Sequence, residues 1–106
     1  MPRVKLVAAA EEDLYEIHRY IETGDSPERA DELLGRLEHA IGSLIEMPER
    51  GHFPPELDRI GIRDYREIHF KPWRIVYAIV DKSVVVHCVL DGRRDMQTLL
   101  QQRLLR

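Results

Sequence analysis

The sequence contains little of what secreted or membrane-spanning proteins require. Cys88 is the single cysteine among 106 residues, so no intramolecular disulfide can form, and a lone thiol fits a reducing compartment. No apolar run approaches the about 18 residues that span a bilayer, and the N-terminus lacks the apolar segment of a signal peptide. These absences predict a cytoplasmic protein that does not enter a membrane.

Motifs for cofactors and metals are missing as well. The chain has no glycine-rich phosphate loop, no nucleophile elbow and no paired Cys/His spacing. His69 and His87 fall on predicted strands that can lie near one another, but zinc needs three or four convergent ligands and the spacing supplies no further one. The sequence therefore predicts no metal site and no cofactor.

The composition is that of one globular domain over residues 1–106, with 43% hydrophobic and 33% charged residues. The net charge of −3 is uneven: residues 1–49 carry 5 basic and 12 acidic side chains, and residues 50–106 carry 11 basic and 7 acidic ones. Either the first half forms helices with solvated acidic faces, or a basic face in the second half meets an acidic partner. The acidic balance argues against strong general affinity for nucleic acid, and we expect no sequence-specific binding to it.

Helical periodicity in the first half predicts two helices that form a hairpin. Gly24 is expected to end the first helix in a left-handed conformation. Ser26 and Pro27 are a typical helix start, because serine caps free N–H groups and proline at the first position has none to satisfy. The second helix is expected to continue as far as Pro48. Its apolar stripe includes Leu33, Leu34, Leu37, Ile41 and Leu44. The acidic residues that begin the first helix are expected to be solvated: Glu11, Glu12, Asp13 and Glu16.

The period changes to two after a long loop. Residues 48–63 are rich in proline and glycine, which predicts a loop, and Phe53 and Leu57 are expected to anchor it. Three alternating segments follow and predict an antiparallel meander: residues 65–70, 73–80 and 83–90. In the last segment Cys88 is expected to be a small core residue on the face of Val84, Val86 and Leu90.

Short elements complete the chain at both ends. Residues 4–7 alternate as a strand does, and Asp95 can cap a final helix. The order β-α-α-β-β-β-α predicts an α+β fold, with a helical hairpin packed on a small antiparallel sheet. Both faces of the last two strands are apolar enough for more than one surface of the sheet to be covered.

Four arginines are the strongest candidates for binding a macromolecular target. Arg66 and Arg74 fall on neighbouring predicted strands, and Arg93 and Arg94 follow the last one. Guanidinium groups that point one way from a sheet edge suit phosphates or the carboxylates of a protein partner. For any single arginine the alternative is local pairing with an acidic neighbour: Asp64, Glu67, Asp91 or Asp95.

The final predicted helix carries an apolar stripe with two interpretations. It can dock onto the core of its own domain, or it can form a surface that a partner covers. The stripe consists of Leu99, Leu100, Leu104 and Leu105.

Taken together, these segments resemble the ParE branch of the ParE/RelE superfamily of toxins from type II toxin–antitoxin systems. Each segment is degenerate alone, but their order and spacing are specific, and they cover nearly the whole chain. The resemblance implies the fold described above. It rests on residues 13–21 and 44–57, on Tyr65-Arg66-Glu67-Ile68, on residues 73–77 and 84–86, and on Asp91-Gly92-Arg93-Arg94-Asp95.

The resemblance implies one of two activities. ParE-like toxins poison DNA gyrase, whereas RelE-like toxins cleave messenger RNA on the ribosome. Arg74 and Arg94 match arginine positions of the RNase pattern, but Leu100 falls where that pattern has a catalytic tyrosine. Residues 96–105 contain no Tyr, His, Glu or Asp, so a general acid/base contribution of about 10²–10⁴-fold would have to come from elsewhere. The sequence thus favours a non-enzymatic gyrase inhibitor over an mRNA endoribonuclease, and a degenerate member that binds only its antitoxin is a third hypothesis.

The family also implies a cognate antitoxin that wraps and neutralises the toxin. Its flexible tail is expected to lie along the hairpin and the sheet, near Leu33 and Leu37, or along the final helix, near Leu99 and Leu104. The predicted partners are therefore the antitoxin and DNA gyrase.

Overall fold

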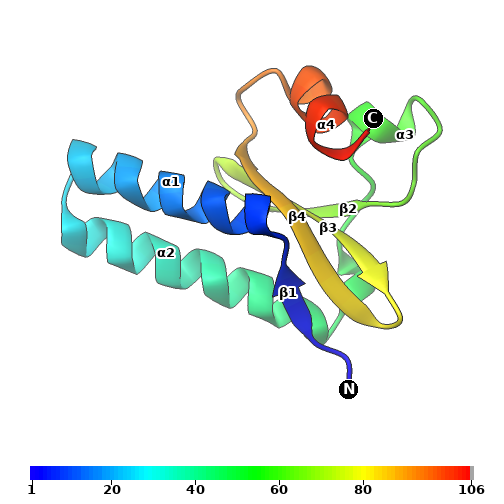
Figure 1. Ribbon diagram of the computed structural model, residues 1–106, viewed down its shortest axis with the longest axis horizontal. Coiled ribbons are helices and arrows are strands. Elements are labelled where there is room, and N and C mark those ends of the chain that lie inside the picture. Colours follow the sequence, from blue (N-terminus) through cyan, green and yellow to red (C-terminus); the bar gives the residue numbers. More distant parts are fainter. Residues whose placement is uncertain (106) are drawn as a thin grey trace.

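The computed structural model describes residues 1–105 and has the predicted order of helices and strands (Figure 1). One short helix, α3, and two 3₁₀ turns, η1 and η2, are additional. None of the helices in this part of the chain is long and apolar enough to cross a membrane. The elements are β1 (Val4–Leu6), α1 (Ala8–Gly24), α2 (Pro27–Gly42), η1 (Ser43–Ile45), η2 (Pro48–Arg50), α3 (Pro55–Asp58), β2 (Arg66–Phe70), β3 (Trp73–Val80), β4 (Ser83–Asp91) and α4 (Met96–Leu104).

The hairpin of α1 and α2 begins and turns largely as predicted. Ser26 Oγ accepts a hydrogen bond from the Arg29 N–H at 3.1 Å, and Pro27 occupies the first turn. The prediction for Gly24 is wrong, because it is the last residue of α1 and has no positive φ. The next N–H, of Asp25, still bonds to the carbonyl of Ile21, so the helix ends without a left-handed residue. The second helix also ends earlier than predicted, at Gly42, and η1 continues the chain toward Pro48.

The sheet has the strand order β1-β4-β3-β2. Strands β2, β3 and β4 form the predicted antiparallel meander. Strand β1 differs, since it pairs in parallel with β4, with Val4 opposite Val84 and Leu6 opposite Val86. Parallel neighbours need a long connection, and here the hairpin and the meander lie between the two strands. The sheet is therefore mixed, with β1 and β2 as its edges.

A register shift in the centre of the sheet changes which side chains of β4 share a face. Val76 lies opposite Cys88, but the next residue, Tyr77, lies opposite Val86, so His87 is an extra residue in β4. The bulge reverses the alternation, and Cys88 faces away from Val84 and Val86. The predicted common face is therefore wrong for Val84 and Val86 and right for Leu90, and Cys88 is buried as expected.

Both faces of the sheet are covered, as the sequence predicted. The hairpin packs on one face, while α3 and α4 lie on the other (Figure 1). Leu57 of α3 is fully buried and anchors the long loop. The hairpin-side core contains Ala10, Leu14, Leu37, Ile41, Leu44, Ile75, Tyr77, Val84, Val86 and Val89. The second core contains Leu57, Val76, Cys88, Leu90, Met96 and Leu100.

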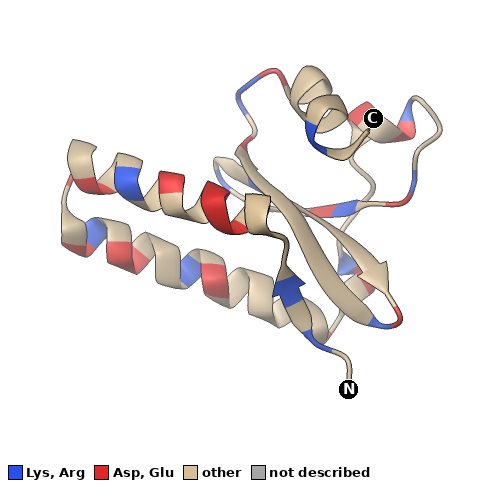
Figure 2. Cartoon of the chain, viewed as in Figure 1, with Lys and Arg blue, Asp and Glu red and all other residues tan. Residues whose placement is uncertain are grey.

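Asp13 connects α1 to both β4 and α4. Strand β1 pairs with β4 only as far as Val86, so the remaining outer edge of β4 needs other partners. The Asp13 carboxylate accepts the N–H of Val89 at 2.9 Å and two N–H groups of Arg103 at 3.0 and 2.9 Å. Arg103 also donates to the His87 carbonyl. The expectation that Asp13 is solvated is wrong, because its carboxylate is held by these hydrogen bonds. The other acidic residues of α1 and α2 are exposed, and Figure 2 shows acidic residues along both helices.

Candidate functional site

Three charged side chains, Glu56, Arg74 and Glu67, form connected ion pairs on the side of the sheet that α3 and α4 cover. Arg74 of β3 donates its Nε–H to Glu67 Oε1 at 2.7 Å and its two terminal nitrogens to Glu56 at 2.9 and 2.6 Å. The Arg74 side chain is only 11% exposed. Its hydrogen bonds to Glu56 raise the pKa of Arg74 further above its ordinary value, and they lower the pKa of Glu56. All three guanidinium nitrogens are thus directed at carboxylates of the same chain.

Two glycines allow the close packing around this cluster. A Cβ at Gly92 would lie 2.8 Å from Cδ of Arg74, and a Cβ at Gly51 would lie 2.5 Å from the Tyr77 hydroxyl and 2.7 Å from the Glu67 carbonyl. The N–H of Gly51 donates to the Tyr77 hydroxyl, which in turn donates to the Pro48 carbonyl. The start of the long loop is therefore fixed against β2 and β3.

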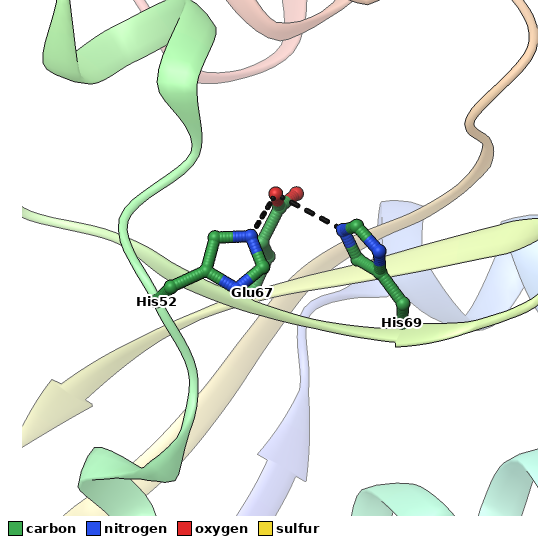
Figure 3. Close-up of side chains that lie close together, drawn as sticks. All are labelled: His52, Glu67 and His69. Carbon is green, nitrogen blue, oxygen red and sulfur yellow. Dashed lines mark hydrogen bonds and ion pairs between the residues drawn. The ribbon is translucent and has the colours of Figure 1, made fainter.

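His52 and His69 approach the same oxygen of Glu67 (Figure 3). Their Nε2 atoms lie 2.8 and 3.2 Å from Glu67 Oε2, and the two rings are T-shaped with centroids 5.1 Å apart. Glu67 is buried, whereas the side chains of His52 and His69 are 57% and 48% exposed. A backbone bridge between His52 and Glu67 holds the loop against the outer edge of β2.

The sequence alone found only part of this group. Glu67 and His69 share a face because residues two apart on a strand do so, and this much was predictable. His52 comes from the loop, 15 residues from Glu67, and no periodicity places it there. The expected neighbour of His69 was His87, which instead packs edge-on against the Tyr65 ring and has a pKa lowered by burial.

The predicted target-binding arginines do not form one surface. Arg66 donates to the carbonyls of Glu49 and Gly51 and lies over the ring of Phe53, near the loop. Arg74 is held in the ion pairs described above. The expectation of four convergent guanidiniums is therefore wrong, because Arg66 lies against the loop, although Arg74 and Arg93 line one hollow.

Arg93 and Arg94 do lie together, at the rim of a hollow between α1 and the end of β4. The Arg93 side chain is 77% exposed and pairs with Asp91, whose pKa this hydrogen bond lowers to about 2. The hollow measures about 470 Å³, and its apolar lining includes Ile17, Tyr20, Ile21 and Trp73. Exposed aromatic side chains beside arginines are typical of protein interfaces.

The residues predicted to bind an antitoxin differ in how much of each side chain is exposed to solvent. Leu37 is fully buried in the hairpin-side core, so the structure contradicts its prediction as a contact residue. Leu33 is partly exposed above the same core, and it stays a candidate. Leu99 and Leu104 are partly buried against the second core, so the helix α4 docks onto its own domain.

A second groove lies between β1 and the hairpin. It measures about 530 Å³, and its lining includes Val4, Leu6, Tyr15, Leu34 and Glu38. The Tyr15 side chain is exposed at this groove. The groove follows an edge strand, whose free backbone groups are available to pair with another chain.

Comparison with known proteins agrees with the resemblance of the sequence. A family model described as the ParE toxin of the type II toxin–antitoxin system, parDE, matches residues 4–96. Toxin ParE3 of Caulobacter vibrioides is 27% identical over 103 residues, which are 97% of this chain and 99% of that protein.

Two solved structures have the same fold. The chromosomal ParDE toxin–antitoxin system from P. aeruginosa matches with a TM-score of 0.70 and 16% identity, over 84% of this chain and 94% of that one. The RelBE2 toxin–antitoxin complex from Mycobacterium tuberculosis matches with a TM-score of 0.59 and 22% identity, over 84% of this chain and 96% of that one. Because this family model matches most of the chain, the chain belongs to the ParE toxin family of type II toxin–antitoxin systems.

Proposed function

We propose that this toxin binds and inhibits DNA gyrase, and thereby blocks replication, without performing a reaction itself. The main observation behind this proposal is the hollow between α1 and β4, where exposed Tyr20 lies beside Arg93 and Arg94. This surface has the chemistry of a protein interface. Gyrase acts on chromosomal DNA, so the proposed place of action is the cytoplasm.

The environment of Arg74 and Leu100 also supports a non-enzymatic role. A phosphate-binding arginine needs free N–H groups, but three of the five N–H groups of Arg74 donate to Glu56 and Glu67. Leu100, at the position of the RNase-type tyrosine, is fully buried in the second core. Both observations support an inhibitor that performs no reaction on RNA.

A supercoiling assay with purified gyrase tests the proposal. We expect the toxin to inhibit supercoiling and to accumulate cleaved plasmid. Replacing both Arg93 and Arg94 by alanine should raise the inhibitory concentration about tenfold or more, since arginines in interfaces often contribute more than 1 kcal/mol. Arg29→Ala on the exposed face of α2 is the matched control. Folded wild-type protein with no effect at large excess would contradict gyrase as the target.

The second proposed partner is a cognate antitoxin that covers the groove beside β1. The groove combines a free strand edge with the apolar side chains of Tyr15 and Leu34, which suits an extended or helical peptide tail. The solved ParDE and RelBE2 structures are toxin–antitoxin assemblies, which supports a partner of this kind. Tyr15→Asp should weaken co-purification with the product of the neighbouring reading frame, whereas Tyr20→Asp should leave it intact. Equal capture of both variants would place the antitoxin elsewhere.

Ribosome-dependent cleavage of mRNA is the alternative function. The observation in its favour is the pair of half-exposed imidazoles, His52 and His69, beside Arg74. Transcripts cut in the ribosomal A site by the wild type, and not by His69→Ala or Arg74→Ala, would reverse the ranking. If inducible expression causes no growth arrest, the third hypothesis, a member that only binds its antitoxin, is favoured instead.

A further inference from the structure

The group of His52, Glu67 and His69 has the composition and geometry of a transition-metal site. One ligand atom from each residue lies within 4.8 Å of the other two. The two imidazole Nε2 atoms converge on Glu67 Oε2 from two different segments of the chain (Figure 3). We propose that these three residues bind one Zn²⁺ ion, a role that is independent of the proposed inhibition of gyrase.

The carboxylate in direct contact with both histidines favours a cation between them, although His69 also lines a hollow with Lys71 and Arg93. Glu56 and Glu67 flank Arg74, so these three groups together carry a charge of −1. Each of the three guanidinium nitrogens of Arg74 already donates to a carboxylate. An anion between the two Nε2 atoms would meet the Glu67 carboxylate, whereas a dication there would meet one carboxylate oxygen and two imidazole nitrogens.

The ligand set is one that zinc uses. Two histidines and one glutamate form a three-ligand site, with the fourth position left to water or another ligand. Zinc–ligand bonds of about 2.0–2.2 Å in a tetrahedron separate the ligand atoms by about 3.4 Å. The Nε2–Oε2 distances of 2.8 and 3.2 Å therefore need to lengthen by about 0.6 and about 0.2 Å, and the two histidine nitrogens, which lie within 4.8 Å of one another, need to settle at a similar separation. The half-exposed histidine side chains have room for this change.

The surroundings fix the orientation of the glutamate. Arg74 Nε binds Glu67 Oε1 at 2.7 Å and leaves Oε2 directed at the two imidazoles. Such outer partners typically contribute about 10–100-fold to metal affinity. The backbone bridge of His52 to Glu67 holds the third ligand in place. In the metal-free protein the Nε2–H tautomer of each histidine donates to Oε2, so binding of the ion through Nε2 requires the tautomer that carries its proton on Nδ1.

Calorimetric titration of the tag-free protein with Zn²⁺ at about pH 7.5 tests the site. We expect one ion per chain. His52→Ala and His69→Ala should each weaken binding more than about tenfold, because each removes a direct ligand. His18→Ala is the matched control: His18 also approaches a carboxylate, Asp31, at 2.8 Å, but has no third ligand. A wild type that binds no stoichiometric Zn²⁺, or three variants of equal affinity, would overturn the proposal.

Histidine NMR gives a readout that does not depend on variants. One equivalent of Zn²⁺ should shift the imidazole signals of His52 and His69 and leave those of His18 and His39 unchanged. Shifts confined to His18 or His39 would mean that the ion binds elsewhere, and the proposed site would be wrong.

Discussion

The two buried groups Cys88 and Glu67 have different surroundings. Cys88 is buried in the second core, and burial raises the pKa of its thiol to about 12. Glu67 is equally inaccessible, but Arg74 and two histidines supply hydrogen bonds to both of its oxygens. A buried carboxylate persists only when its oxygens have such partners.

Cys88 should therefore be inert in the native state. Thiol reagents attack the thiolate, and both the raised pKa and the lack of access suppress its formation. We expect no modification by a disulfide reagent at neutral pH in buffer and rapid, stoichiometric modification in denaturant. Rapid modification of folded protein would contradict the burial of Cys88.

Replacing Glu56 by glutamine should destabilise the protein. The substitution leaves Arg74 nearly buried with one carboxylate partner fewer, and breaking a buried ion pair costs about 3–5 kcal/mol. Because Glu56 is 15% exposed and solvent screens part of the interaction, we expect a loss of about 2–3 kcal/mol in urea unfolding. Glu22→Gln, at an exposed position of α1, is the matched control and should change the free energy of unfolding little.

The same ion pair predicts a pH dependence. Arg74 lowers the pKa of Glu56 from 4.5 in the folded state, so the unfolded chain binds this proton at a higher pH. The stabilisation is complete above about pH 4.5 and is lost as the pH falls through the lowered folded pKa. The difference in unfolding free energy between the wild type and Glu56→Gln should thus shrink as the pH falls below about 4.5. A constant difference across urea curves in this range would assign the stabilisation to another cause.

For the helices and strands, features that depend on neighbouring residues were predicted better than features that depend on contacts between distant segments. Ser26 and Asp95 cap α2 and α4 as predicted, because an N-cap depends on neighbouring residues alone. The bulge at His87 could not be predicted from the sequence, because β-branched residues occur on both sides of it. The parallel pairing of β1 and the approach of His52 to Glu67 also depend on tertiary packing, which periodicity does not encode. For the same reason the predicted arginine surface contained both exposed Arg93 and nearly buried Arg74.

Asp13 should be the most important acidic residue of α1 for stability. Asp13→Ala removes the acceptor for the Val89 N–H and for the Arg103 guanidinium, and hydrogen bonds to charged groups contribute about 1.5–3 kcal/mol each. We expect a loss of about 3 kcal/mol in urea unfolding, and an unchanged value for exposed Glu12→Ala one residue before it. Equal effects of the two substitutions would mean that Asp13 does not connect α1 with β4 and α4.

For the whole molecule, the two cores should unfold together because they share the central strands β3 and β4. Leu100→Ala leaves a cavity in the second core and should cost about 2–5 kcal/mol. Trp73, the single tryptophan, packs against the hairpin-side core instead. Its fluorescence and the far-UV circular dichroism of this variant should therefore shift to the same lower denaturant midpoint. Separate midpoints would show that the cores are independent units.

The parallel pairing of β1 with β4 has a consequence for synthesis on the ribosome. The first strand is made early, yet its partner residues 84–86 emerge only after most of the chain has been translated. Until then the sheet lacks β4, which lies between β1 and β3, and distant pairings of this kind form late. We expect translation products that stop before Val84 to lack the native sheet. A truncated mRNA would then produce a fragment that lacks the hollow beside Arg93 and Arg94, and we expect such a fragment not to be toxic.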